Sequence, residues 1–282
     1  MRGASSTGPD VAERPARPTR RARRRDDERR GPLPALLLGA AVLGLWLYAS
    51  RSGTIPQILL PDPLRVLERL WLASTRAGLL DYAWVTLREA VLGCASAAAF
   101  AIPLAWTLHH WDLFRRAVLP YVAASQAIPA IAIAPLLVLW IGYGTVPIVV
   151  LCAFMVFFPI TVTVLLGLRG LDADILDAAR LDGAHGWTMV VHMEAPMVLP
   201  AILAGVRTAF TLSITGAVIG EMVMGGDGMG QLLSIQRDAV DTTGLFATIT
   251  LLCAMATTVH WLLLAAEHRS RTVAALRGRR AT

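Results

Sequence analysis

The chain contains no lysine and no asparagine. A phosphate-binding P-loop needs the lysine of G-x-x-x-x-G-K-[ST], so this absence excludes the conventional P-loop ATPases. The missing asparagine excludes N-linked glycosylation, whose acceptor sequence begins with that residue. Only three cysteines are present, and their scattered positions within apolar runs fit neither a disulfide framework nor a metal site. We expect Cys94, Cys152 and Cys253 to be small core residues.

Charged residues are scarce outside the ends of the chain. They make up 16% of the 282 residues, whereas hydrophobic residues make up 55%. Residues 1–32 hold ten Arg against five acidic residues, and the rest of the chain holds sixteen Arg against fifteen. The formal net charge of +6 therefore belongs mostly to one tail, which we expect to be disordered and to fix membrane orientation. No nucleic-acid partner is expected.

Long apolar runs fill most of the remaining sequence. Several uncharged windows exceed 18 residues, the length that predicts a transmembrane helix. The sequence therefore predicts an all-α, polytopic membrane protein embedded in a lipid bilayer. Six transmembrane helices are expected, at 33–49, 82–108, 117–141, 146–168, 197–219 and 245–266.

Two segments depart from a straight span. The third expected span contains Pro120, Pro129 and Pro135, so it must bend or unwind locally. Residues 50–81 combine leucines and a tryptophan with arginines at helical spacing, which predicts an amphipathic helix on the membrane surface. A short basic turn is expected at 109–116.

One loop between two apolar runs is strongly charged. Each charge at the centre of a lipid-embedded helix costs roughly 2.5–3.5 kcal/mol, so this loop must lie in water. The nine ionisable residues from Arg169 to Glu194 are Arg169, Asp172, Asp174, Asp177, Arg180, Asp182, His185, His192 and Glu194.

The pattern of this loop predicts two short helices. Asp172 can cap the first helix, and Gly183 follows where a left-handed residue is expected to end it. A second helical segment begins near Trp187, and Pro196 is expected to end it before the next span. The small residues Ala178 and Ala179 keep one side thin enough to enter a groove in another protein.

The same residues resemble a known family motif. Asp177-Ala178-Ala179, Gly183 and Met193-Glu194-Ala195-Pro196 are similar to the E-A-A-x3-G-x9-I-x-L-P loop of binding-protein-dependent ABC importer permeases. Three positions differ from the motif, with Asp177 for Glu, Met193 for Ile and Ala195 for Leu. In that family the loop docks on the ATPase subunit. The resemblance implies an ATPase-coupling role for Asp177, Ala178, Ala179, Arg180, Gly183, Ala184 and Pro196.

The resemblance extends over residues 82–266. It implies a five-helix type I permease core, to which this chain adds one N-terminal helix within 33–81 and a basic C-terminal tail at 267–282. Within the family the chain is most similar to the taurine, sulfonate, nitrate and thiamine-precursor group. The stretches that carry this similarity are 125–129, 134–144, 157–160, 220–222 and 228–230.

The resemblance also implies the partners and the setting. They are two copies of a cytoplasmic ATPase, an extracytoplasmic substrate-binding protein and a second permease subunit that makes a homodimer. No cofactor is expected on this chain, because ATP and Mg belong to the ATPase. The location is a bacterial cell membrane, and the expected cargo is a sulfonate- or nitrate-like anion or a pyrimidine-type vitamin precursor.

The candidate residues of the transport path are Ser125, Gln126, Arg207, Thr211 and Glu221. An intramembrane arginine indicates function by default, so Arg207 is expected either to bind an anionic substrate or to form a structural ion pair. Glu221 is expected either to gate the path or to be a plain interfacial acid. The Gly216-x-x-x-Gly220 spacing predicts close helix packing.

The arginine distribution places both termini, the turn 109–116 and the loop 169–196 in the cytoplasm. The segment 50–81, on the outer side, carries four arginines against this pattern. The sequence argues against two other functions. A secondary transporter needs paired broken helices and midplane ionisable groups, and these are few. An intramembrane enzyme needs a nucleophile-and-base or metal cluster at membrane depth, and the lone His260 does not supply one.

Overall fold

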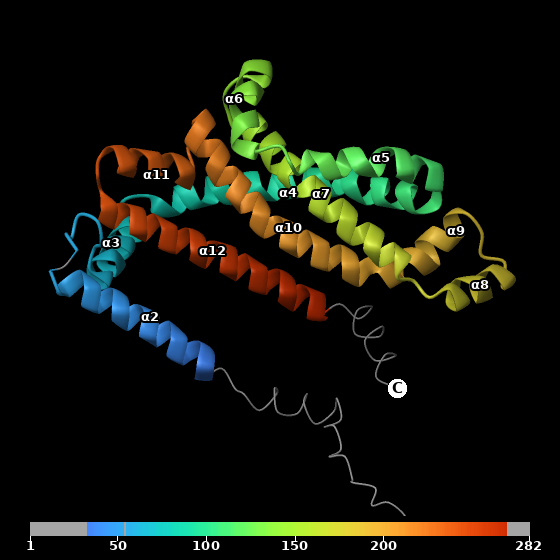
Figure 1. The fold of residues 1–282 in the computed structure, drawn as a ribbon, viewed down its shortest axis with the longest axis horizontal. Coiled ribbons are helices and arrows are strands. Elements are labelled where there is room, and N and C mark those ends of the chain that lie inside the picture. The colour runs from blue at the N-terminus through green and yellow to red at the C-terminus, as the bar shows by residue number, and fades with distance from the viewer. Residues whose placement is uncertain (1–32, 54, 270–282) are drawn as a thin grey trace, which may run out of the picture. The chain divides into compact units, whose positions relative to one another are not determined.

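The computed structural model describes residues 33–53 and 55–269. Every regular element in this part of the chain is a helix (Figure 1). The chain divides into two units after Ile55. The first unit contributes α2 (Leu33–Arg51), and the second, from Pro56 onward, contains all the other helices. The tail expected at 1–32 lies outside the described residues. So does the tail expected at 267–282, except for residues 267–269, which belong to the last helix.

Four helices are long and apolar enough to cross a membrane: Leu79–His110, Thr145–Arg169, Trp187–Met224 and Thr242–Glu267. They contain α4 (Leu79–His110), α7 (Thr145–Arg169), α10 (Ala195–Met224) and most of α12 (Thr242–Arg269). All four coincide with expected spans. A bent pair of shorter helices can count as one further span, which gives up to five spans among the described residues. The first expected span, at 33–49, corresponds to α2, which falls among the shorter apolar helices.

The bent pair consists of α5 (Asp112–Ser125) and α6 (Ala130–Ile141), which meet at 96°. The break lies at Pro129, because proline has no N–H to donate and drives the preceding residue toward an extended conformation. The bend expected in this span is therefore confirmed. The basic turn expected at 109–116 is present but shorter than expected, since only Trp111 lies between the end of α4 and the start of α5.

The core forms where α4, α7 and α10 pack together. Four glycines lie at the contact between α7 and α10. Because glycine has no side chain, the two helices approach closely along most of their length. The close packing predicted at Gly216 and Gly220 is among these contacts. The pairs are Gly167 with Ala201, Gly205 with Thr163, Gly216 with Cys152, and Gly220 with Ile148. Two of the three cysteines lie in this core, whereas Cys253 is exposed.

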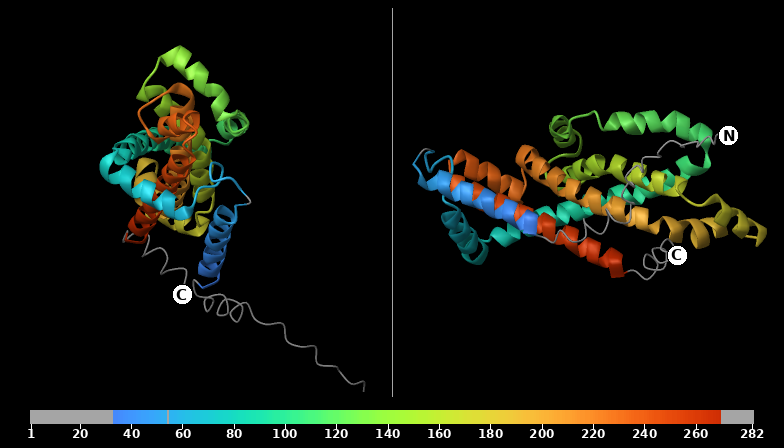
Figure 2. Two further views of the ribbon diagram at one scale, coloured as in Figure 1. Left: turned by 90° about the vertical axis from the view of Figure 1, so that its left-hand side faces the viewer. Right: turned by 60° about the horizontal axis from the view of Figure 1, so that its bottom comes forward.

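The second unit carries different small elements at its two ends. Figures 1 and 2 place α8 (Ala173–Leu181) at one end and α11 (Met229–Asp238) at the other. The helix α3 (Pro63–Arg76) is amphipathic, as predicted, and packs against α12 near α11. Its position on a membrane surface stays a prediction.

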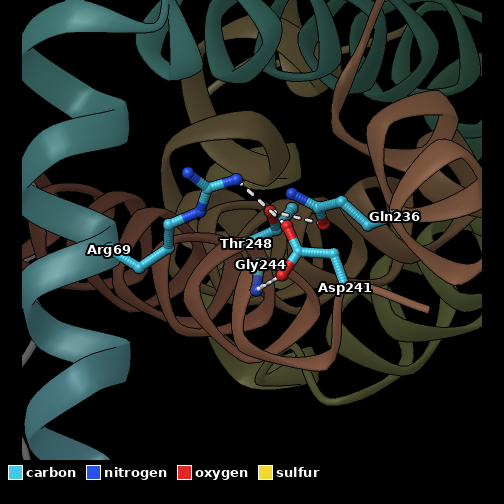
Figure 3. Close-up of polar contacts among 5 residues, drawn as sticks. All are labelled: Arg69, Gln236, Asp241, Gly244 and Thr248. Atoms are coloured by element: carbon cyan, nitrogen blue, oxygen red, sulfur yellow. Dashed lines mark hydrogen bonds and ion pairs between the residues drawn. The ribbon is translucent and has the colours of Figure 1, made fainter. Parts of the chain in front are cut away.

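A set of polar contacts fastens α3 to the connection between α11 and α12 (Figure 3). The Arg69 guanidinium reaches Asp241 at 3.0 Å, and Asp241 also accepts the Gly244 N–H at 2.8 Å. Beside them, the Thr248 hydroxyl donates to the Gln236 carbonyl oxygen at 3.0 Å. These bonds hold the carboxyl end of α11 in place.

We predict that Gly167→Ala destabilises the protein. The new Cβ would overlap the Ala201 side chain and lie 2.9 Å from Val198 Cγ2, so α7 and α10 must separate. Overpacking of this kind costs about 1–3 kcal/mol. The matched control is Gly170→Ala, whose Cβ would meet its nearest atoms at 3.4 and 3.6 Å and should change stability by less than about 0.5 kcal/mol. Thermal unfolding in detergent measures both, and equal melting temperatures would contradict the packing argument.

Candidate coupling site

The helix α8 begins and ends as the sequence predicts. Asp172 Oδ1 accepts the Asp174 N–H at 3.0 Å and so caps the first turn. At the other end Gly183 has a φ of +93°. The Gly183 N–H donates to the Arg180 carbonyl, and the Ala184 N–H donates to the Ala179 carbonyl. This is a Schellman ending, which holds a nine-residue helix in one conformation.

The outer side of α8 is available to a partner. Asp177, Ala178 and Arg180 are exposed, whereas Ala179 is buried. Arg180 Nη1 lies 2.5 Å from Asp177 Oδ1, but more than half of each side chain is exposed. Exposed ion pairs contribute little to stability, so both charges can be used in recognition.

A surface hollow of about 480 Å³ lies between α8 and the start of the next helix. Small and apolar side chains make much of its wall, and acidic residues stand at two points. Its lining consists of Asp174, Ile175, Ala178, Ala179, Asp182, Ala184 and Met193.

The arm that follows the loop is one continuous helix from Trp187 to Met224. It comprises α9 (Trp187–Met189), a π turn, η1 (Val190–Glu194), and α10. The expectation that Pro196 ends a separate helix is therefore wrong. In the π turn the Ala195 N–H bonds to the Val190 carbonyl, and Pro196 follows where its missing N–H is tolerated. The loop is thus joined directly to a membrane-crossing helix.

Glu194 fastens this arm to α4. Although the sequence places it in a water-side loop, the side chain is buried. Trp106 Nε1 donates to Glu194 Oε2 at 2.9 Å, and His110 Nε2 lies 3.3 Å from Oε1. Sequence reasoning missed this anchor. The available signal was the four-residue spacing of Trp106 and His110, which puts both on one face of a helix.

The five candidate path residues do not form one cluster. Ser125 and Gln126 lie where α5 meets α6, and the Ser125 hydroxyl donates to the Val122 carbonyl at 2.7 Å. Thr211 is exposed on α10. Arg207, one turn earlier, donates to Glu267 Oε2 of α12 at 2.5 Å. Glu221 lies fourteen residues beyond Arg207, which is about 21 Å along the helix.

Glu221 is completely buried, so its interpretation as an interfacial acid is wrong. Its Oε2 accepts the Gly230 N–H at 2.5 Å. A second buried acid, Glu89 of α4, was not among the sequence candidates. Thr86, one turn before it, accepts the Met229 N–H at 2.8 Å and so links α4 to the start of α11.

These features define a class of protein: a helical membrane protein that carries a capped, exposed helix at one end. Among the described residues no group of three His, Cys, Asp or Glu side chains could hold a metal ion. Residues 92–272 match the family described as "Binding-protein-dependent transport system inner membrane component", and the chain belongs to this family.

Curated relatives share this membership. The chain is 34% identical to the riboflavin transport system permease protein of Chloroflexus aurantiacus, over 80% of this chain and 86% of the relative. It is 31% identical to the formylaminopyrimidine transport permease protein of Halalkalibacterium halodurans, over 74% and 82% of the two chains. A Bacillus subtilis permease named for aliphatic sulfonates is 25% identical, over 79% and 80%.

A solved structure shares the fold. The inward-facing MetNI methionine ABC transporter contains a chain that matches with a TM-score of 0.60 at 18% identity, over 72% of this chain and 98% of that chain. The protein is therefore the permease subunit of an ABC importer, a multi-pass inner-membrane protein that is not itself catalytic. Its family carries no cofactor of its own and works with an ATPase and a binding protein.

We predict that Glu194→Leu lowers the free energy of unfolding by about 1–3 kcal/mol, because it leaves the Trp106 N–H without its acceptor. Glu194→Gln keeps an oxygen for Trp106 and should fall between the wild type and Glu194→Leu. Melting temperatures of the three proteins in one detergent give the order. A Glu194→Leu protein as stable as the wild type would mean that this bond does not anchor the arm.

Proposed function

We propose that α8 is the coupling helix of this permease and inserts into a groove of its ATPase. The observation that carries the proposal is a capped and exposed helix with small Ala178 on its outer side. On this assignment Asp177, Arg180 and the turn at Gly183 and Ala184 also contact the ATPase. The family membership makes an ATPase partner necessary, and α8 is rigid enough to bear on it.

The loop and its arm transmit the motion of the ATPase into the membrane. Pro196 acts here as part of the continuous arm rather than as a contact residue. When two ATPase subunits close, α8 moves with them, and the arm carries the displacement into α10. The Glu194 anchor moves α4 with it, because Trp106 and His110 hold that carboxylate.

We assign the loop 169–196 and both chain termini to the cytoplasm, on the arginine distribution. The permease domain spans residues 82–266, and the first transmembrane helix at 33–49 is an addition to it. Two copies of the chain enclose the path, and two copies of the ATPase bind below them. The membrane-crossing part of α12 is not buried against the rest of its own chain. This exposed apolar surface supports a contact with a second copy of the chain.

We propose that the cargo is a small heterocycle of the flavin or pyrimidine type. Two relatives above 30% identity are named for riboflavin and formylaminopyrimidine, whereas the sulfonate-named permease is 25% identical. The argument for an anion rested on Arg207, but Glu267 holds its guanidinium. Ser125, Gln126 and Thr211 remain the uncharged candidates for contact with such a cargo.

We predict that Ala178→Trp releases the ATPase. A large side chain on the thin side of α8 would keep it out of a groove, and losing a central contact costs about 2 kcal/mol or more, which is over tenfold in affinity. The matched control is Ala239→Trp, an exposed alanine at the α11 end of the molecule. Co-purification from membranes measures the amount of ATPase retained. Equal retention by both variants would remove α8 from the ATPase interface.

We also predict that uptake of a heterocycle requires ATP. Cells that express the chain with the ATPase and binding protein of its system should accumulate labelled riboflavin or a pyrimidine vitamin precursor. An alkanesulfonate should not be accumulated. Uptake that survives without ATP and collapses with the ion gradient would contradict the importer mechanism, and accumulation of the sulfonate would contradict only the cargo.

A further inference from the structure

Two glutamates are buried together at the end of the core that lies away from α8. Glu89 of α4 is 1% exposed, and Glu221 of α10 is fully buried. Thr86, one turn before Glu89 on α4, accepts the Met229 N–H, and Glu221 accepts the N–H of the next residue, Gly230, so the two acids are neighbours. They are 132 residues apart in sequence, and the packing of α4 against α10 brings them together.

The surrounding donors satisfy only part of this pair. The Gly230 N–H donates to Glu221 Oε2, and the Thr86 and Thr145 hydroxyls lie beside the two acids. Glu89 Oε2 and Glu221 Oε1 are left without any hydrogen-bond partner in the structure. A buried oxygen without a donor is costly, and two such oxygens on neighbouring carboxyl groups point to a missing ligand between them.

The buried charged residues of the described part of the chain are all glutamates, so no buried cation balances the pair. Arg88, next to Glu89 in the sequence, is exposed, and its guanidinium donates to Thr145 at 3.5 Å. Of the other ionisable groups near the pair, Cys152 on α7 is buried in the core, and Asp227 in the loop before α11 is exposed and acidic. Two neighbouring buried carboxylates would therefore repel each other, with only the exposed Arg88 to offset the repulsion.

We propose that Glu89 and Glu221 hold one proton between them. One carboxyl group is then a neutral acid that donates to the other, so both orphaned oxygens are used by a single hydrogen bond. A proton fits better than a metal ion because the backbone closes tightly on the pair. A Cβ at Gly228 would overlap the Glu221 carboxyl, and one at Gly230 would lie 2.9 Å from its Oε2.

The shared proton joins three parts of the chain. Glu89 belongs to α4, Glu221 to α10, and the Gly230 N–H to the start of α11, whose neighbour Met229 is bonded to Thr86 of α4. The contacts of Figure 3 fasten the other end of α11. The proton site thus lies at the end of the core opposite α8. The proposal of a shared proton does not depend on the proposal that α8 is the coupling helix.

Infrared spectroscopy of the full chain in lipid bilayers tests this site, since a protonated carboxylic acid has its own C=O stretch. The wild type at pH 7 should show this band, and carbon-13 labelling of its glutamate carboxyls should shift it. The chain has only seven glutamates, so variants can assign the band. Glu89→Gln and Glu221→Gln should each alter or remove it, and the double variant should abolish it. Glu194→Gln, a buried acid that already has two partners, should leave it unchanged.

Several results would overturn the proposal. One is a labelled wild type without the band, which needs no variant to fold. A second is a folded double variant that keeps the band. A third is a band that responds to only one of the two substitutions, because the proton would then belong to one carboxyl group alone. A fourth is a wild type whose melting temperature rises with sodium while that of the double variant does not, which would make the pair a cation site.

Discussion

A charge in hydrocarbon costs roughly 2.5–3.5 kcal/mol even on the lenient insertion scale, and this constraint determines where every ionisable group of the chain can lie. Most charged residues of the loop lie beyond the ends of α7 and α10, in and around the exposed helix α8. Within the helical core each buried charge has a specific solution. Arg207 lies against Glu267, and Glu194 lies between Trp106 and His110.

Local chemistry made much of the fold predictable. The apolar runs located α4, α7, α10 and α12, because length and composition alone decide what can cross a bilayer. The cap at Asp172, the left-handed Gly183 and the break at Pro129 were equally readable, since each depends on the conformational preference of one residue. The helix α8 was recognisable for the same reason, as its capping residues lie in one short stretch.

What the sequence did not reveal depends on partners far along the chain. Nothing near Glu194 indicates that Trp106 will bind it, and nothing near Glu221 indicates Glu89. Both acids looked solvated because charged neighbours or a loop adjoin them. Pro196 was misjudged for a different reason, since a π turn can absorb a proline that an ordinary helix cannot. Such a turn has no sequence signature of its own.

α10 connects the loop that carries α8 with the buried pair of Glu89 and Glu221. Its beginning carries the loop arm and the Glu194 anchor, and its last turn carries Glu221. The glycines between α7 and α10 keep one register from Gly167 to Gly220, at four successive levels. Because the helices are in contact at every one of these levels, we expect them to move together. A tilt imposed at the end near α8 would then displace the end near Glu221 in the opposite direction.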